Sequence, residues 1–440
     1  MSNTPGNEKQ KELFEDKSFW GMTVTQFLGA FNDNLFKQLI LLLAVAGTDV
    51  QGWATTVFSL PFVLLSGLAG FLSDRFSKSR VIFLAKIAEI GIMTLGVVAF
   101  LSYDWFGAIG TWSVLFLMGT HSTFFGPGKY GILPELFKEK DLARANGIIL
   151  MSTFLAIIFG TVAAGAMGDW LLVPEEGKPL NAQPLWIGSM VGVGLACIGT
   201  AAAWFIRPTP PAQPRAKLTA EDLGVSKDIR HLLFTDRPLL AALLVSCVFW
   251  MVSGIAVPTV NRLGKDLLHV DKTKTSLLVA AIAFGIVLGS VVAGLFLKKV
   301  RPSKQVKLGL WGIVVALVLL GFWKSNPDEP QSKLSMLGYQ GSFVVLFLMG
   351  MAAAIYAIPL QVFLQKKPPA AIKGRMIATM NQANFVGILI SGPLYQLFEA
   401  IAQLLQWPIT SVFWMMMLLV LPLALFYRMK DELPSELKQA

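Results

Sequence analysis

Twelve apolar stretches dominate this sequence, and each is long enough to cross a lipid bilayer as a helix. A spanning helix needs about 20 predominantly apolar residues. In the first half, the stretches cover roughly residues 20–46, 50–73, 80–102, 108–126, 146–169 and 184–206. In the second half, they cover roughly residues 238–260, 275–297, 304–323, 341–363, 374–398 and 404–427. The pattern predicts an all-α integral membrane protein with twelve transmembrane helices.

The composition argues against other classes of protein. Of the 440 residues, 54% are hydrophobic and only 15% are charged, and the mean hydropathy is +0.61. Because soluble domains are nearer a quarter charged, a soluble enzyme, a secreted disulfide scaffold and a disordered chain are excluded. The two cysteines lie in apolar runs and the three histidines are far apart, so we expect no metal site. Without a nucleotide-binding or catalytic motif, we also expect no cofactor and no enzymatic activity.

A Pro-rich and then polar segment divides the apolar stretches into two sets of six. It begins with Arg207-Pro-Thr-Pro-Pro-Ala-Gln-Pro-Arg215. We therefore predict an N-terminal six-helix lobe at 1–206, a connector at 207–237 and a C-terminal six-helix lobe at 238–440. The halves also resemble each other, because Ala69-Gly70 aligns with Ala293-Gly294 in the corresponding loop. Two parallel six-helix repeats are a known transporter architecture.

The positive charges predict how the chain is oriented in the membrane. Of the 37 Lys and Arg residues, 28 fall in the two tails and the loops on the connector side, and seven fall in the opposite loops. Such a bias places the basic side in the cytoplasm, so we expect both termini there. The net charge of +10 is then a topological signal with some attraction to anionic headgroups, and we expect no nucleic-acid partner.

The first apolar stretch carries polar side chains near its middle, in the order Phe31-Asn32-Asp33-Asn34 with Lys37 after them. On a helix, Asp33 and Lys37 share one face. A charge at mid-membrane costs about 2.5 kcal/mol or more, so a helix keeps this face only where it lines a wet cavity or finds partners. We favour a cavity-lining site. The alternative is that the two groups, four residues apart, neutralise each other as a packing device.

Two further groups of charges lie in or near apolar stretches. Lys86 and Glu89 are a close pair that we interpret as structural, because the sequence places no cluster of amides around them. After the fourth stretch, Pro127 is expected to break the helix. Lys129 and Glu135 then flank the break with opposite charges, which suits a zwitterionic ligand or an internal gate. An ordinary turn is the alternative.

The loop after the second stretch, Gly70-Phe-Leu-Ser-Asp74-Arg75-Phe-Ser-Lys78-Ser-Arg80, resembles the signature of the major facilitator superfamily. Serines stand at two positions where that family prefers glycine or a basic residue. The resemblance implies a major facilitator fold, in which this loop holds one face of the protein closed until substrate shifts the balance. The residues that we assign to gating are Gly70, Asp74, Arg75, Lys78, Arg80 and Arg144.

Three motifs together resemble the lysophospholipid transporter family of that superfamily. They are Phe31-Asn32-Asp33-Asn34, then Pro127-Gly-Lys129-Tyr130-Gly-Ile-Leu-Pro-Glu135-Leu136, and Ala145-Asn146-Gly147. The resemblance covers the N-terminal half well and the C-terminal half weakly. Some members are encoded beside or fused to an acyltransferase, which implies such a partner, and this chain is expected to be a stand-alone version. Better-known members carry an Arg within helix 7, whereas here the nearest is Arg262 near the helix end. Either the gate is built differently, through Lys37 for example, or the substrate differs.

The resemblance thus implies a monomeric transporter of lysophospholipids, such as lysophosphatidylethanolamine, in the inner membrane of a bacterium and in contact with membrane lipids. One alternative is a proton-coupled exporter of amphipathic drugs or metabolites, with Asp33 as the proton carrier. Another is a membrane scaffold for an acyltransferase. Amides of the later helices, such as Gln382, can bind a headgroup or hold helices together. The residues that we assign to substrate binding are Asn32, Asp33, Asn34, Lys37, Lys129, Tyr130, Glu135 and Gln382.

Overall fold

The protein is almost entirely helical in the computed structural model, which describes residues 13–43, 50–172, 181–270, 272–296, 300–325 and 333–430. Within these ranges, twelve long helices coincide with the twelve apolar stretches. Helices suit such stretches because a helix satisfies its own backbone hydrogen bonds where lipid offers no partners. The prediction of a twelve-helix membrane protein built from two six-helix lobes is confirmed.

The first lobe contains six long helices, one short helix and two 3-10 turns. The long helices are α1 (Lys17–Leu42), α2 (Val50–Arg75), α3 (Lys78–Leu101), α4 (Tyr103–Gly131), α6 (Glu139–Leu171) and α7 (Trp186–Ala203). The short α5 (Leu133–Leu136) joins α4 to α6. Turns of 3-10 helix precede α1 at Leu13–Glu15 and α7 at Gln183–Leu185.

The second lobe repeats the arrangement. Its long helices are α9 (Arg237–Arg262), α10 (Lys272–Val291), α11 (Pro302–Gly321), α12 (Gly338–Lys366), α13 (Lys373–Leu404) and α14 (Ser411–Phe426). π-helical turns at Leu263–Leu267 and Val292–Phe296 follow α9 and α10, and a 3-10 turn at Ala370–Ile372 precedes α13. The segment between the lobes holds a 3-10 turn at Ala220–Leu223 and the amphipathic α8 (Lys227–Thr235).

One element departs from the all-helical expectation. The strands β1 (Trp323–Ser325) and β2 (Lys333–Ser335) form an antiparallel pair between α11 and α12, with Trp323 opposite Ser335. The ring of Trp323 lies 4.8 Å from that of Trp414, centre to centre. The hairpin therefore covers the end of α14 with aromatic side chains.

Nine helices in the described part of the chain are long and apolar enough to cross a membrane by those two measures alone. The other three long helices are α1, α4 and α14. The α1 helix carries the charged cluster, and α14 has only 16 residues. Large apolar side chains remain exposed on the outside, among them Trp105, Trp170 and Trp204 near helix ends. Aromatic side chains at such positions are typical of the interface between membrane and water.

Local backbone geometry explains two helix boundaries. Gly107 has a φ of 53° inside α4, which separates the first turn from the continuous helix after it. Only glycine takes that conformation without strain, and the predicted start at residue 108 falls at this break. The last helix begins at Ser411 rather than at residue 404, because the chain turns at Gln406 (φ 56°) and continues into Trp407-Pro408.

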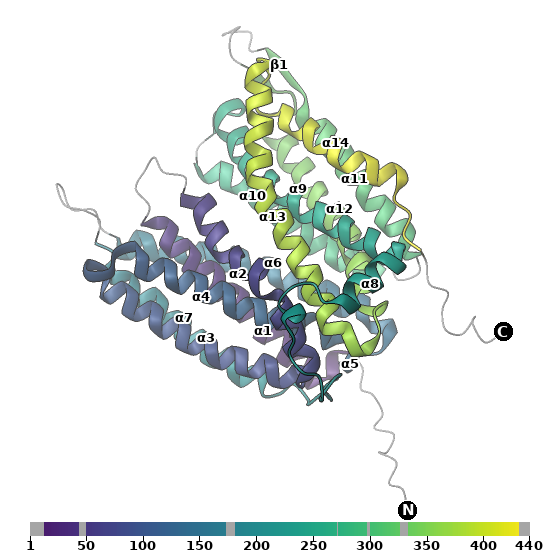
Figure 1. Ribbon diagram of the computed structural model, residues 1–440. Coiled ribbons are helices and arrows are strands. Elements are labelled where there is room, and N and C mark those ends of the chain that lie inside the picture. The colour runs from purple at the N-terminus through teal and green to yellow at the C-terminus, as the bar shows by residue number, and fades with distance from the viewer. Residues whose placement is uncertain are drawn as a thin grey trace, which may run out of the picture.

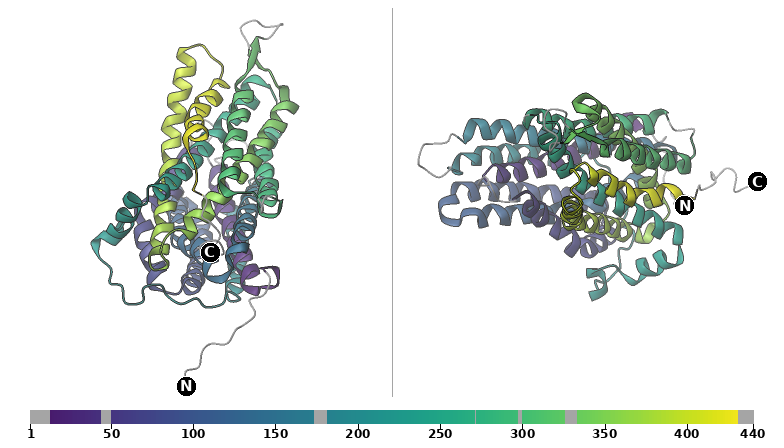
Figure 2. Two further views of the ribbon diagram at one scale, coloured as in Figure 1. Left: turned by 90° about the vertical axis from the view of Figure 1, so that its right-hand side faces the viewer. Right: turned by 90° about the horizontal axis from the view of Figure 1, so that it is seen from above.

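The two lobes diverge like the arms of a V (Figure 1). They meet at the end of the molecule where α5 and α8 lie, which we call the connector end (Figures 1 and 2). There α2 packs against α13, and α6 packs against α10. The lobes are therefore joined at one end of their helices and splayed at the other.

Candidate functional site

A carboxylate of the first lobe binds the start of α13 in the second lobe. Asp74, at the end of α2, accepts hydrogen bonds from the backbone N–H groups of Gly374 (2.6 Å) and Arg375 (3.0 Å). A negative charge at a helix N-terminus is favourable because the first N–H groups have no partner within the helix. Gly70 lies one turn earlier on α2, where a Cβ atom would come within 2.8 Å of the Arg375 Cα. A larger residue at Gly70 would push the lobes apart.

Three further side-chain pairs lie at the connector end. Lys78, which is fully buried, forms an ion pair of 2.6 Å with Glu135 within the first lobe. Between the lobes, Asn146 and Gln365 exchange two amide hydrogen bonds of 2.8 and 3.0 Å, and Lys366 pairs with Glu139. Both amides of the Asn146–Gln365 pair are buried, so opening this end would leave four polar atoms to find other partners.

The remaining gating candidates take different positions. Arg75 lies over the rings of Phe71 and Phe76, at 5.9 and 5.5 Å, and Arg80 is exposed. The Arg144 guanidinium stacks 3.9 Å above the Phe14 ring. The Arg144 backbone faces Gly294, mirroring how Arg375 faces Gly70. The two halves thus form equivalent contacts at the same end of the molecule.

Replacing Asp74 by alanine should shift the protein away from the conformation in which the connector end is closed. Hydrogen bonds to a charged group contribute about 1.5–3 kcal/mol each, so losing them should lower the share of this conformation about tenfold or more. Spin labels at Asp104 and Gln340, at the splayed end, would report the change as a shorter distance population. The control is Asp228→Ala, because Asp228 contacts Arg375 only at 3.7 Å and is 65% exposed. Unchanged distances in Asp74→Ala would contradict the gating role.

Asp33 and Lys37 lie on the same face of α1 but do not pair with each other. Among the described residues, the structure has no ion pair between them within 4.0 Å, although their charges interact at longer range. Asp33 accepts a hydrogen bond of 2.7 Å from the Ser122 hydroxyl on α4. The Lys37 ammonium lies 5.9 Å from the centre of the Phe58 ring. Both side chains are partly exposed, which is the arrangement expected of a polar face that lines an open space.

A second polar group extends this face toward the connector end. The Lys129 ammonium donates to the Thr153 hydroxyl at 3.3 Å and lies 5.0 Å from the centre of the Tyr130 ring. Thr153 in turn donates to the amide oxygen of Gln26 on α1 at 2.9 Å. Lys129 is 9% exposed and interacts electrostatically with Asp33. Two amines and one carboxylate therefore share this side of the first lobe.

An aromatic stack joins the two lobes. The rings of Phe62 on α2 and Phe385 on α13 lie 3.6 Å apart, centre to centre, and almost parallel. The depth of a residue can be measured from the connector end, where α1 begins and α2 ends, at 1.5 Å per residue. By this measure Asp33 lies about 24 Å deep along α1 and Phe62 about 20 Å deep along α2. Asp33 therefore lies at about the depth of the stack. Gln382, one turn nearer the connector end, donates to the Val63 carbonyl at 2.7 Å.

Several predicted substrate-binding residues are occupied by contacts within the protein. Asn32 is fully buried and its amide nitrogen donates to Glu89 (2.7 Å) and to the Gly192 carbonyl (3.0 Å). Glu135 is bound to Lys78, and Gln382 links the lobes. Asn34 donates back to the Ala30 carbonyl of its own helix. Adjacent residues on a helix point in different directions, so Asn32 faces α3 and α7 while Asp33 faces α4.

The sequence predicts only part of a buried charged cluster in the first lobe. Lys86 and Glu89 form an ion pair with side chains 0% and 2% exposed. One amide, that of Asn32, donates to the same carboxylate, a contact that the sequence did not predict. The His121 imidazole lies 3.4 Å from Glu89, and its other nitrogen lies 3.5 Å from the Ser122 hydroxyl. His121 and Ser122 thus lie between Glu89 and Asp33, and the His121 Nε2 makes no hydrogen bond within the described residues.

Pro127 does not end a helix, contrary to the prediction. The α4 helix continues through Pro127 to Gly131. Prolines are tolerated in membrane helices where neighbouring groups satisfy the freed backbone. Lys129 therefore projects from a helix into the lobe and not from a loop, and Glu135 pairs with Lys78 instead.

Better-known members of the family carry an arginine within the seventh membrane helix, which is α9 here. The nearest arginine in this chain, Arg262, is the last residue of α9 and lies at the splayed end of the second lobe. It pairs with Asp266 one turn later and with Glu399 on α13. Those two carboxylates satisfy it locally, so it is engaged away from Asp33. In the described part of the chain, no three His, Cys, Asp or Glu side chains gather closely enough to hold a metal ion.

The sequence matches a family model described as the Major Facilitator Superfamily over residues 19–392. It is 26% identical to the lysophospholipid transporter LplT of Yersinia pestis (strain Pestoides F) over 395 residues, which cover 87% of this chain and 86% of that protein. The LplT protein of Yersinia pseudotuberculosis serotype I (strain IP32953) matches equally well.

Solved transporter structures share the fold. The transporter FucP in its outward conformation superimposes with a TM-score of 0.73 at 10% identity, covering 93% of this chain and 98% of that one. The human organic anion transporter MFSD10 gives 0.68 at 16% identity, covering 92% and 99%. Both are named as transporters and not as enzymes.

Proposed function

The chain belongs to the Major Facilitator Superfamily, and from this premise we propose that it transports lysophospholipids. In the proposed cycle, a lysophospholipid such as lysophosphatidylethanolamine moves from the outer to the inner leaflet of a bacterial inner membrane. The connector end and both termini then face the cytoplasm. The similarity to LplT proteins over most of the chain supports this substrate class.

The unpaired charges on α1 are the observation that carries the proposal. A lysophosphatidylethanolamine headgroup has a positive ammonium and a negative phosphate. Asp33 and Lys37 are both partly exposed, and they form no direct ion pair within 4.0 Å although their charges interact at longer range. Ionisable groups kept in the membrane without a direct partner have room for another one. A zwitterionic headgroup supplies one opposite charge for each of them.

We assign roles on this basis. Asp33 binds the headgroup ammonium, and the Ser122 hydroxyl holds the Asp33 carboxylate in place. Lys37 or Lys129 binds the phosphate. The bound headgroup loses its water while crossing, and these side chains replace that hydration. The acyl chain stays against apolar surfaces and needs no such replacement.

Rocking of the two lobes completes the cycle. The connector end is held closed by Asp74, by the Asn146–Gln365 pair and by the Phe62–Phe385 stack. Breaking these contacts while closing the splayed end would expose the headgroup to the other side. Alternating access of this kind is the common mechanism of two-repeat transporters.

The test is lipid movement in vesicles that carry the purified protein. Fluorescent lysophosphatidylethanolamine is placed in the outer leaflet, and the fraction that resists extraction by albumin is followed over time. We expect protected lipid to accumulate faster than in protein-free vesicles, with no imposed gradient. Equal rates with and without protein would overturn the proposal.

The placement of His121 between Asp33 and Glu89 favours proton-coupled export as a second candidate. The imidazole lies 3.5 Å from the Ser122 hydroxyl that donates to Asp33, and 3.4 Å from Glu89. Passing a proton along this series requires the imidazole to turn into a hydrogen bond with Glu89. In that case the substrate would be an amphipathic drug or metabolite. Collapsing the proton gradient would abolish export of this kind, whereas downhill movement of a lysophospholipid would continue.

A further inference from the structure

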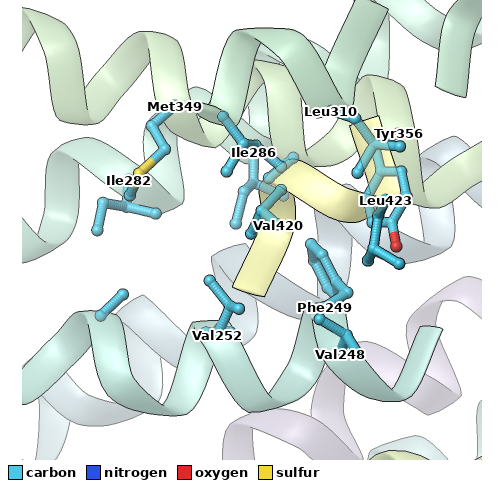
Figure 3. Close-up of a pocket in the computed structure, with 14 residues that line it drawn as sticks. Val248, Phe249, Val252, Ile282, Ile286, Leu310, Met349, Tyr356, Val420 and Leu423 are labelled. Carbon is cyan, nitrogen blue, oxygen red and sulfur yellow. The ribbon is translucent and has the colours of Figure 1, made fainter. Parts of the chain in front are cut away.

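The second lobe contains an apolar cavity that is open at one side (Figure 3). It contains about 570 Å³ of empty space, including the part at its mouth. Side chains of α9, among them Phe249 and Val252, face Ile282 of α10 and Met349 of α12 across it (Figure 3). Leu310 of α11 and Val420 and Leu423 of α14 also line it.

The lining offers almost nothing to a polar ligand. Its side-chain polar atoms are the hydroxyls of Ser253 and Tyr356. The Tyr356 hydroxyl already donates to the Val245 carbonyl at 2.6 Å. Cavities walled by aliphatic and aromatic groups stay dry and accept hydrocarbon, whereas a headgroup would lose its hydration there without compensation.

The cavity borders the space between the lobes. A second cavity of about 460 Å³ shares Phe249 and Tyr356 with it and reaches Tyr130 and Asn146 of the first lobe. Phe249 therefore stands between the interior of the second lobe and the interlobe space. Along α9 at 1.5 Å per residue, Phe249 lies about 18 Å from the helix start, and Ala256 about 28 Å. Asp33, about 24 Å along α1, is at a similar depth.

We propose that this cavity holds the acyl chain of the transported lysophospholipid while its headgroup occupies the first lobe. The inference rests on the proposed function and adds a second contact to it. An acyl chain that entered past Phe249 would contact the apolar side chains of α9, α10 and α12 along the cavity.

The cavity affects which acyl chains are transported more than it affects the binding affinity for the lysophospholipid. Lipid tails in the bilayer are as apolar as the cavity wall, so moving a chain between them releases little free energy. A chain that is too long for the cavity, in contrast, forces side chains apart. We therefore expect the cavity to control chain-length selectivity.

Ala353 on α12 lines the cavity, and Ala353→Phe should fill part of it. Movement of 1-palmitoyl lysophosphatidylethanolamine should fall at least about tenfold, the equivalent of about 1.4 kcal/mol. Movement of the 1-octanoyl lipid should change less than about twofold, because a short chain leaves the filled region empty. Ala353→Val, a smaller change, should give an intermediate loss. The control is Leu348→Phe, which adds an aromatic ring at a site that is 52% exposed on the same helix.

A cross-linking measurement gives an answer that does not depend on transport by a variant. A palmitoyl lysolipid with a diazirine at the chain end is photolysed on the wild-type protein in vesicles. We expect labels on Ile282 and Met349. Labels confined to outward-facing residues such as Leu348, in a protein that moves the lipid, would overturn the acyl-chain site alone. If the wild-type protein moved neither the 1-palmitoyl nor the 1-octanoyl lysolipid, the proposed function itself would be overturned.

Discussion

Replacing Asp33 by asparagine should lower the initial rate of lysophosphatidylethanolamine movement about tenfold. A hydrogen bond to a charged group contributes about 1.5–3 kcal/mol, whereas one between neutral groups contributes about 0.5–1.5 kcal/mol. A difference of about 1.4 kcal/mol is one factor of ten in rate. Asparagine keeps the size of the side chain and can still accept the bond from Ser122. The loss therefore reports the charge and not the packing.

Two controls separate this role from general damage. Lysophosphatidylglycerol has the phosphate but no ammonium, so the Asp33→Asn variant should move it at close to the wild-type rate. Asp104→Asn makes the same chemical change at an acid near the splayed end that accepts a hydrogen bond from Gln183, and it should leave both rates unchanged. If Asp33→Asn moved both lipids normally, the assignment of Asp33 to the headgroup would be wrong.

Removing Glu89 should destabilise the protein far more than removing a partner from an exposed ion pair. Its carboxylate is the ion-pair partner of Lys86, which is fully buried in the first lobe. Deleting one partner of a buried ion pair costs about 3–5 kcal/mol, because the other charge is left without compensation. Glu89→Ala should therefore lower the Tm of the purified protein and its yield in the membrane. Asp266→Ala is the control, since the Arg262 pair is partly exposed and exposed pairs contribute about 0–1 kcal/mol.

A double variant tests whether the cost comes from the unpaired charge. Lys86→Met with Glu89→Leu removes both charges and keeps apolar volume, and replacing a whole buried pair in this way is often neutral or stabilising. We expect its Tm to lie above that of Glu89→Ala. A double variant less stable than either single one would indicate that the cluster acts through Asn32 and His121 instead.

The number and placement of the helices could be predicted from the sequence alone. A run of about 20 apolar residues has no stable alternative to a helix in lipid, so the twelve stretches reappear as twelve helices in the described chain. Errors occurred where a local signal was outweighed by its surroundings. Pro127 is such a case, because the α4 helix passes through it. The late start of α14 is another, since the turn at Gln406 depends on backbone geometry.

The candidate site could be predicted less completely. The sequence placed Asp33 and Lys37 on one helix face, and the structure keeps both partly exposed. Asn32, next to them in the chain, instead points into the packing between helices. A signal for its role was present, because Glu89 and Lys86 form a buried pair that needs further hydrogen-bond donors. Which helix supplies the donor could not be read from spacing along the chain.

The sequence by itself determined that this chain crosses a membrane many times in two similar halves, because hydrophobic length and the distribution of basic residues are properties of each segment alone. Tertiary structure alone decided which charges are paired and which are left open. Lys86 and Glu89 are enclosed by neighbouring helices, whereas Asp33 and Lys37 remain partly exposed on α1. The physical reason is that the free energy of a charge in a membrane protein depends on what surrounds it in three dimensions, and that information is held in the packing of helices far apart in the chain.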